Sequence, residues 1–207
     1  MFLCQPVTLT GQYATLVPLV AGHHDDMVEA VQDGELWRLW YTAIPTPQGV
    51  AAEIQRRLSL QDQGAMLPFA VIENASGKAV GMTTYMNIDN SNRRVEIGST
   101  WYRRRVQRTV LNTECKMLLL QHAFEQLQCI AVEFRTHFFN QQSRAGIERL
   151  GAKLDGVLRS HQVNPHSDAK GSLRDTCVYS VIAPEWPTVR AHLSYQLNKP
   201  RAPSAGA

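Results

Sequence analysis

Short segments in which apolar and polar residues alternate are interspersed with segments that carry apolar residues at helical spacing. A period of two is typical of half-buried β-strands, whereas a spacing of three to four residues is typical of amphipathic helices. The predicted strands cover 14–18, 68–73, 79–85, 95–101, 130–135, 153–161 and 174–181. The predicted helices cover 23–32, 48–63, 140–150 and 184–197, and a further helix begins near Asn112 or Thr113. These elements predict a mixed α/β sheet with helices on both faces.

A basic turn joins one of these strands to the next helix, within the run from Trp101 to Glu114. The alternation predicts one strand face with Val95, Ile97, Ser99 and Trp101 and the other with Glu96, Gly98 and Thr100. The first backbone N–H groups of the helix are expected to point back into the turn, where four arginines lie between 103 and 108. A helix start and positive side chains together favour an anion such as a diphosphate. A solvated basic loop is the alternative interpretation.

The same arrangement recurs further along the chain. Residues 130–135 alternate as a second strand, and a helix follows that opens at Asn140 and ends before Gly151. Strand, turn, helix and strand in this order predict a parallel crossover unit, which places both helix starts at the same end of the sheet.

Six segments of the chain occur in an order and spacing found in a known family. They are Glu96-Ile97-Gly98, Gln107 to Asn112, Asn140-x-x-Ser143-Arg144, Glu148 to Ala152, Gly156 to Arg159, and Arg174 to Ser180. Together they resemble the GNAT acyl-CoA-dependent N-acetyltransferases, and within these the RimJ/RimL-type branch, whose known members acetylate ribosomal-protein N-termini. The resemblance implies a single domain over residues 6–197, with a mostly antiparallel central sheet of six to seven strands. Residues 198–207 have the composition of a disordered tail.

The resemblance also implies acetyl-CoA as co-substrate and a set of residues that contact it. These residues are Thr100, Trp101, Gln107, Arg108, Thr109, Val110, Leu111, Asn112, Asn140 and Arg144. The family loop usually reads Gln/Arg-x-x-Gly-x-Gly/Ala, and here Val110 and Asn112 occupy the glycine positions. Glycine permits positive φ and a close approach of the backbone to phosphate. Either the loop binds with ordinary helical dihedrals and help from side chains, or its phosphate binding is weakened.

The implied chemistry is attack of an amine on a thioester, which requires a group that accepts a proton from the amine. Glu96 is the candidate base because it lies on the strand that leads into the cofactor turn; the alternative is a strand-face carboxylate paired with Arg94 or another cation. Many family members use a tyrosine as the acid, but the matching position here is Ile147. Ser143 is the candidate substitute, and its alternative role is hydrogen bonding at the helix start.

An aromatic cluster of Trp37, Trp40 and Tyr41 precedes Pro45. In the resembling family this region borders the acceptor site, so the three rings are candidates for its apolar wall, and core packing is the alternative. The acceptor itself is left open among a protein N-terminus, a lysine and a small amine. A catalytically degenerate CoA-binding regulatory domain is the alternative function, and a homodimer is also left open.

Composition adds few constraints. A formal net charge of +3 with the basic residues concentrated near the turn suits an anionic cofactor better than a long nucleic-acid track. An oligonucleotide binder using Arg103–Arg105 with Trp101 and Tyr102 is a further alternative. Neither His23-His24 nor His161 with His166 has a convincing ligand set, so no metal is expected. With no basic leader and no apolar run of about 18 residues, we expect no membrane association and a cytoplasmic location.

Overall fold

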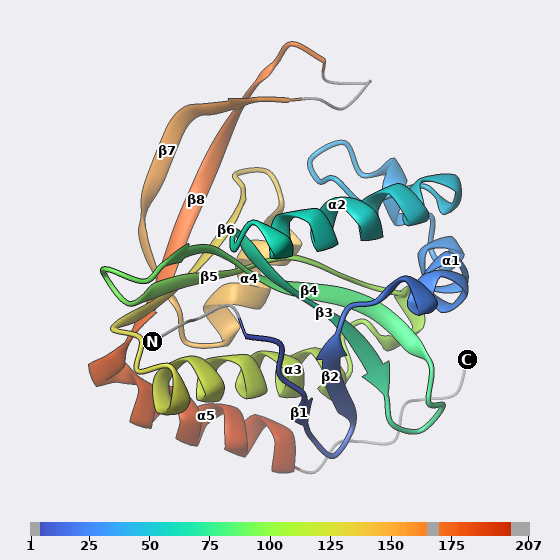
Figure 1. The fold of residues 1–207 in the computed structure, drawn as a ribbon. Helices are drawn as coiled ribbons and strands as arrows, with labels where there is room; N and C mark the ends of the chain where they lie inside the picture. The colour runs from blue at the N-terminus through green and yellow to red at the C-terminus, as the bar shows by residue number, and fades with distance from the viewer. Residues whose placement is uncertain (1–4, 165–169, 200–207) are drawn as a thin grey trace.

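The computed structural model describes residues 5–164 and 170–199. Its centre is an eight-stranded sheet in the order β1-β2-β3-β4-β5-β6-β8-β7 (Figure 1). The strands are β1 (Leu9–Thr10), β2 (Ala14–Pro18), β3 (Met66–Glu73), β4 (Ala79–Asp89), β5 (Arg94–Tyr102), β6 (Ala131–His137), β7 (Lys153–Val163) and β8 (Leu173–Ile182). The expected count of six to seven strands is therefore too low, because the edge strand β1 has two residues and is too short to show alternation.

Helices cover both faces of the sheet, as expected (Figure 1). They are α1 (His24–Gln32), α2 (Val50–Asp62), α3 (Val110–Gln121), α4 (Gln141–Arg149) and α5 (Trp186–Asn198). A π-helical turn, His122–Gln126, extends α3, and short 3-10 turns lie at Ala21–His23, Leu36–Arg38, Pro47–Gly49, Arg104–Val106 and Ala183–Glu185. The expected tail beyond residue 199 lies outside the described residues.

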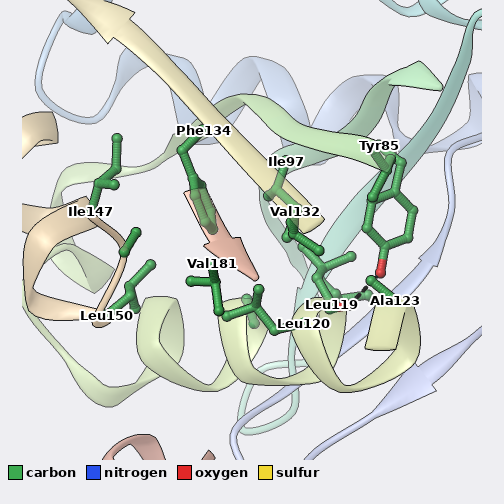
Figure 2. Close-up of a cluster of buried hydrophobic side chains, with 14 of the residues drawn as sticks. Tyr85, Ile97, Leu119, Leu120, Ala123, Val132, Phe134, Ile147, Leu150 and Val181 are labelled. Carbon is green, nitrogen blue, oxygen red and sulfur yellow. Dashed lines mark hydrogen bonds between the residues drawn. The ribbon is translucent and has the colours of Figure 1, made fainter. Parts of the chain in front are cut away.

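Each face of the sheet has its own apolar core. The α3 face carries the larger cluster, and Figure 2 shows Leu119 and Leu120 of α3 and Ala123 of the π-helical turn beneath Val132 of β6 and Val181 of β8. A second cluster packs α1 and α2 against the opposite face, through residues such as Met27, Ile54 and Trp101. The central strands are therefore buried on both faces, which fixes their relative positions.

β5 and β6 are parallel, and they pair over three residues only. Arg94–Glu96 align with Ala131–Glu133, and beyond this point β5 pairs with β4 while β6 pairs with β8. The parallel crossover unit predicted from the sequence is thus present. The two strands separate at their carboxyl ends, on the side where α3 and α4 begin.

A β-bulge in β5 corrects the predicted alternation of this strand. Met82 pairs with Trp101 and Thr84 pairs with Gly98, so two β5 residues lie opposite one residue of β4. Ser99 takes the extra place with a φ of 46°. Because one inserted residue reverses the alternation, Trp101 packs on the α1/α2 face, whereas the Thr100 hydroxyl turns toward α3.

A buried arginine of α2 holds this bulge. Arg57 donates from Nη2 to the Ser99 carbonyl oxygen at 3.0 Å and from Nη1 to Thr84 Oγ1 at 2.6 Å. Its Nε donates to Glu53 at 2.7 Å, so the guanidinium charge is paired although only 2% of the side chain is exposed. A buried charge of this kind is tolerated because each of its donors has a partner.

A buried carboxylate joins α3 to the edge of the sheet. Glu114 accepts backbone N–H groups from Gln12, Tyr13 and Ala14 at 2.8, 2.7 and 2.8 Å. These donors lie between β1 and β2 or at the start of β2. The helix that carries the candidate cofactor turn is therefore anchored to the N-terminal strands.

Helix α3 begins earlier than the apolar spacing indicated. Thr109 is its N-cap: the side chain accepts from Leu111 N at 3.3 Å and donates to the Val106 carbonyl oxygen at 2.7 Å. The first helical residue is Val110 instead of the predicted Asn112 or Thr113. The missed signal is the threonine cap itself, since a hydroxyl at this position satisfies a helix-start N–H.

We predict that Arg57→Met lowers the free energy of unfolding by about 3 kcal/mol, because it leaves the Ser99 carbonyl oxygen and part of Glu53 without a donor. Arg56→Met is the matched control, since Arg56 also binds Glu53 but is half exposed. Its expected loss is below about 1 kcal/mol. Urea unfolding of both variants measures the difference, and equal losses would contradict the assigned role of Arg57.

Candidate active site

Glu96 lies on β5 at the last residue that pairs with β6, and it faces the α1/α2 side of the sheet. Its side chain is almost completely buried, and Asn87 Nδ2 donates to Oε2 at 2.6 Å. Arg135 Nε lies 3.5 Å from the same oxygen. Burial raises the pKa of Glu96, against the opposing effects of Asn87 and Arg135. A carboxyl with a raised pKa suits proton transfer near neutral pH.

The alternative partner for Glu96, Arg94, is engaged elsewhere. Arg94 Nη2 lies 2.6 Å from Glu133 Oε1, and Arg135 Nη2 donates to the other Glu133 oxygen at 3.0 Å. Glu133 therefore takes most of the positive charge on this face. Glu96 is not paired with Arg94, but its ion pair with Arg135 leaves open the alternative of a strand-face carboxylate paired with another cation.

Two of the three candidate acceptor-site aromatics surround a histidine at the end of β6. The Trp40 ring lies 5.1 Å from His137 and the Tyr41 ring 6.5 Å, and Trp40 also lies 6.0 Å from Phe139. Trp37 instead packs against the apolar cluster of α1 and α2. The structure thus places Trp40 and Tyr41 together over the carboxyl end of β6, and Trp37 apart from them.

An open hollow of about 620 Å³ adjoins these rings. Its lining comes from the end of β6 and from the β7–β8 arm: His137, Phe138, Phe139, Val157, Arg159, Ser160, Leu173 and Asp175. Aromatic and aliphatic walls with a few polar groups are typical of small-ligand sites. The hollow meets the ring cluster through His137 and Phe139.

The four arginines of the turn, all expected to add positive charge to it, have two different roles. Arg103 is paired with Glu29 and Asp33, each at 3.1 Å, and Arg105 is paired with Glu73. These pairs hold the turn against α1 and β3. Among the described residues, Arg104 and Arg108 form no ion pair, so these two can supply positive charge to an anion.

The turn has the ordinary helical dihedrals that one of the two interpretations of the sequence requires. Val110 and Asn112 lie within the first turn of α3 and have helical dihedrals, so neither position requires glycine for its backbone conformation. The positive φ of the turn, 61°, occurs at Arg108. Gln107 donates from its side chain to the Tyr102 carbonyl oxygen at 2.8 Å. This bond fixes the turn, and with it the start of α3, to the end of β5.

The second helix start is organised by Asn140. Its Oδ1 accepts from Ser143 N at 3.0 Å, which makes Asn140 the N-cap of α4. Arg144 donates to the Tyr179 hydroxyl at 3.0 Å and to the Phe138 carbonyl oxygen at 3.3 Å. Ile147 is buried in the apolar cluster, so the position of the family's acid is part of the core. No hydrogen bond joins Ser143 to Glu96 within 5–164 and 170–199.

Lys116 is a polar residue of this region that the sequence reasoning missed. Its side chain is buried, and Nζ donates to Thr100 Oγ1 at 2.8 Å and to Thr83 Oγ1 at 3.3 Å. Burial lowers the pKa of Lys116 to about 8. Lys116 lies three, four and seven residues before Leu119, Leu120 and Ala123, which is the spacing of one helix face. This pattern could have indicated from the sequence that the lysine is buried.

No metal site or membrane helix is found where the chain is described. No group of three or more His, Cys, Asp or Glu side chains there could hold a metal ion. The His23-His24 pair is instead engaged locally, with His24 Nδ1 2.8 Å from Asp25. His166 lies outside the described residues. No helix in 5–164 or 170–199 has both the length and the apolar character needed to cross a bilayer.

A family model described as the acetyltransferase (GNAT) domain matches residues 14–153, more than half of the chain. The protein therefore belongs to the GNAT acetyltransferase family, as the sequence motifs predicted. It is 30% identical over 110 residues to the putative ribosomal N-acetyltransferase YdaF of Bacillus subtilis. That alignment spans 53% of this chain and 57% of YdaF, little more than half of either protein.

Solved structures share the fold. A GCN5-related N-acetyltransferase from Brucella melitensis is 30% identical, with a TM-score of 0.83, and the match covers 98% of this chain and 90% of that one. Mycobacterium smegmatis RimJ, solved in complex with CoA-disulfide, has a TM-score of 0.73 at 18% identity, with 93% of each chain covered. These matches confirm the predicted mixed, mostly antiparallel sheet with helices.

We predict that the lowered pKa of Lys116, about 8, gives the wild type a more positive slope of unfolding free energy against pH than Lys116→Met. Between this value and about 10 the unfolded chain holds a lysine proton that the folded protein has lost, which contributes up to about 1.4 kcal/mol per pH unit in favour of folding. Burial raises the pKa of Cys115, Cys129 and Cys177, which acts in the opposite direction in both proteins, so the contribution of Lys116 is the difference between them. Urea unfolding over this pH range measures the slopes. The exposed control Lys153→Met should match the wild type, and equal slopes in the wild type and Lys116→Met would contradict the assignment.

Proposed function

We propose that the protein transfers an acetyl group from acetyl-CoA to a primary amine by direct attack on the thioester. The observation that carries the proposal is Glu96, a buried carboxyl with a raised pKa. It lies where β5 and β6 separate, on the same sheet face as Trp40 and His137. In the proposed step the amine nitrogen bonds to the thioester carbonyl carbon, and the carbon–sulfur bond breaks. The amine proton passes to Glu96, directly or through water, and the CoA thiolate then takes up a proton.

The cofactor is proposed to lie across the gap between β5 and β6. The N–H groups at the start of α3, with Arg104 and Arg108, are assigned to its diphosphate, because a helix start and nearby positive charge favour an anion. Backbone N–H groups of the β5 bulge at Thr100 and Trp101 are assigned to the thioester oxygen. Donors held in place before the reaction stabilise the charge that develops on this oxygen.

The bulge is supported from both faces of the sheet, which favours this assignment. Arg57 binds it from α2 through the Ser99 carbonyl oxygen, and Lys116 binds it from α3 through the Thr100 hydroxyl. Such support restricts the orientation of the intervening peptide N–H groups. Asn140, Ser143 and Arg144 remain assigned to the pantetheine and phosphate side of the cofactor, with Ser143 as the candidate acid.

The acceptor is proposed to be a primary amine at a protein N-terminus, with a lysine or a small amine as the other classes to compare. The name of YdaF, a ribosomal N-acetyltransferase, supports testing a protein α-amine first. Trp40 and Tyr41 are assigned to the apolar wall of the acceptor site, and Trp37 supports their loop from the core.

A CoA-binding domain without turnover is the second candidate function. The specific observation in its favour is Ile147, which leaves the usual acid position apolar and buried. Release of free thiol from acetyl-CoA in the presence of mixed amines separates the two candidates. Turnover supports the transferase, whereas CoA binding without turnover supports the regulatory domain.

We predict that CoA and acetyl-CoA each raise the melting temperature, because a ligand that binds only the folded protein stabilises it. At a ligand concentration of about one hundred times Kd, the gain should be about 2.7 kcal/mol. Differential scanning fluorimetry measures the shift, with adenosine as the control that lacks the diphosphate. No shift at saturating CoA in a folded sample would contradict both candidate functions.

We predict that Glu96→Gln lowers kcat by about 10²- to 10⁴-fold, because the amide cannot accept the amine proton. CoA affinity should stay close to that of the wild type. Since the wild-type rate depends on ionised Glu96, it should rise as pH increases through the raised pKa of this group, and the variant should lack this rise. Glu185→Gln, on the 3-10 turn before α5, is the control. A near-normal rate for Glu96→Gln across this range would overturn the role of Glu96.

A further inference from the structure

Two buried donor atoms on the sheet face of Glu96, Arg174 Nε and His137 Nε2, have no hydrogen-bond partner within the described residues. A third, Arg135 Nε, has no hydrogen bond there and forms only the 3.5 Å ion pair with Glu96. All three residues belong to β6 or to the start of β8, which are neighbouring strands. Buried donors in folded proteins are almost always hydrogen bonded. These donors in one region therefore indicate that an oxygen-bearing ligand binds there.

His137 is the clearest of the three. Only 4% of this residue is exposed, and its Nδ1 accepts from Phe139 N at 3.1 Å. A neutral imidazole that accepts at Nδ1 carries its proton on Nε2. Burial and the charge of Arg174 lower the pKa of His137, which keeps the ring neutral. Nε2–H is therefore a donor, and a ligand oxygen can satisfy it.

The charges on this face leave one cation in excess. Arg94 and Arg135 are paired with Glu133, and Arg135 also lies close to Glu96. Arg174 forms no ion pair with any described residue. Arg174 lies on β8 two residues before Thr176, which pairs with His137, so Arg174 and His137 are diagonal neighbours on one face of the sheet. When Glu96 takes up a proton during the reaction, the positive excess on this face increases by one charge.

A carboxylate satisfies these observations together. It supplies negative charge to the unpaired guanidinium, and its two oxygens can accept from an arginine and a second donor at once. A neutral carbonyl oxygen can also accept two hydrogen bonds, but it would leave the excess charge uncompensated. Trp40 packs on His137 and limits access to water, which strengthens electrostatic interactions at this position.

We infer that Arg174 and His137, with Arg135 beside them, form a subsite for a carboxylate that the acceptor carries close to its reactive amine. The inference rests on the proposed function, since it assigns Glu96 to the amine end of the same acceptor. Two sources have this chemistry: the α-carboxylate of a free amino acid, and an acidic side chain in the first residues of a peptide.

The binding test uses the wild-type protein saturated with CoA, which is unreactive, so that acceptor binding is measured without turnover. Isothermal titration compares each carboxylate with its amide: glycine with glycinamide, and a peptide beginning Asp-Ala with one beginning Asn-Ala. One of the two carboxylate forms should bind at least tenfold more tightly than its amide, and that pair identifies the source. Equal binding within both pairs would overturn the inference.

The variant test uses Arg174→Gln. The carboxylate-over-amide preference, in Kd with CoA and in kcat/KM with acetyl-CoA, should fall below about threefold. Arg174→Lys keeps the charge and should retain part of the preference. Arg190→Gln is the matched control, because Arg190 lies on α5 and pairs with Glu125 on the opposite face of the sheet; it should retain the full preference. A full preference in folded Arg174→Gln would also overturn the inference.

The binding arm separates this inference from the proposed function. If the protein binds CoA and prefers carboxylates but acetylates none of these amines, the transferase proposal fails and the subsite stands. If amines are acetylated with no carboxylate preference in binding or kcat/KM, the transferase proposal stands and the subsite fails.

Discussion

The candidate site depends on the early separation of β5 from β6. A parallel pair that remained hydrogen bonded along its length would bury the backbone of β5 from Ile97 onward within the sheet. Because the two strands pair over three residues only, the carboxyl-terminal part of β5 has one strand neighbour, β4. Its other edge is therefore available for a ligand, and the starts of α3 and α4 lie at the same end of the sheet. The separation thus places a free strand edge and two helix starts at the same end of the sheet.

An unpaired strand edge has to be stabilised by interactions outside the sheet. β5 receives these from its two faces: the guanidinium of Arg57 from α2 and the ammonium of Lys116 from α3, both buried and both bonded to residues at or opposite the bulge. The two buried charges differ in whether an opposite charge is paired with them. Arg57 has Glu53, whereas Lys116 has only hydroxyl groups as partners among the described residues. The cost of burying Lys116 appears in its lowered pKa.

Most of the fold could be predicted from the sequence, because its strands alternate clearly and the crossover unit has a definite order. The helix at 110–121 was placed two residues too late because its apolar pattern starts after its cap. The bulge at Ser99 could not be predicted: alternation shows which residues share a face only while the register is regular. For the same reason Thr100 was assigned to the face of Glu96, whereas its hydroxyl bonds to Lys116.

The site was predicted in part. Glu96, Trp40 and Tyr41 were selected from the sequence, and the structure places them on one side of the sheet. Arg174 was quoted only as part of a family motif. Its place beside His137 results from the pairing of β6 with β8, which brings together residues far apart in the chain. The four arginines between 103 and 108 also cannot be told apart in the sequence. In the structure Arg103 is paired with Glu29 and Asp33, and Arg105 is paired with Glu73.

The bonds of Glu114 have a consequence for the order of folding during synthesis. The backbone N–H groups that bind its carboxylate lie 100 to 102 positions earlier in the chain, at the turn between β1 and β2. As the chain leaves the ribosome, these N–H groups remain solvated until the first turns of α3 have emerged. Contacts across so many residues form slowly because a long loop must close first. Helix α3 and the N-terminal strands therefore become fixed relative to each other in the same late step. Nascent chains shorter than about half the protein then have no assembled candidate site.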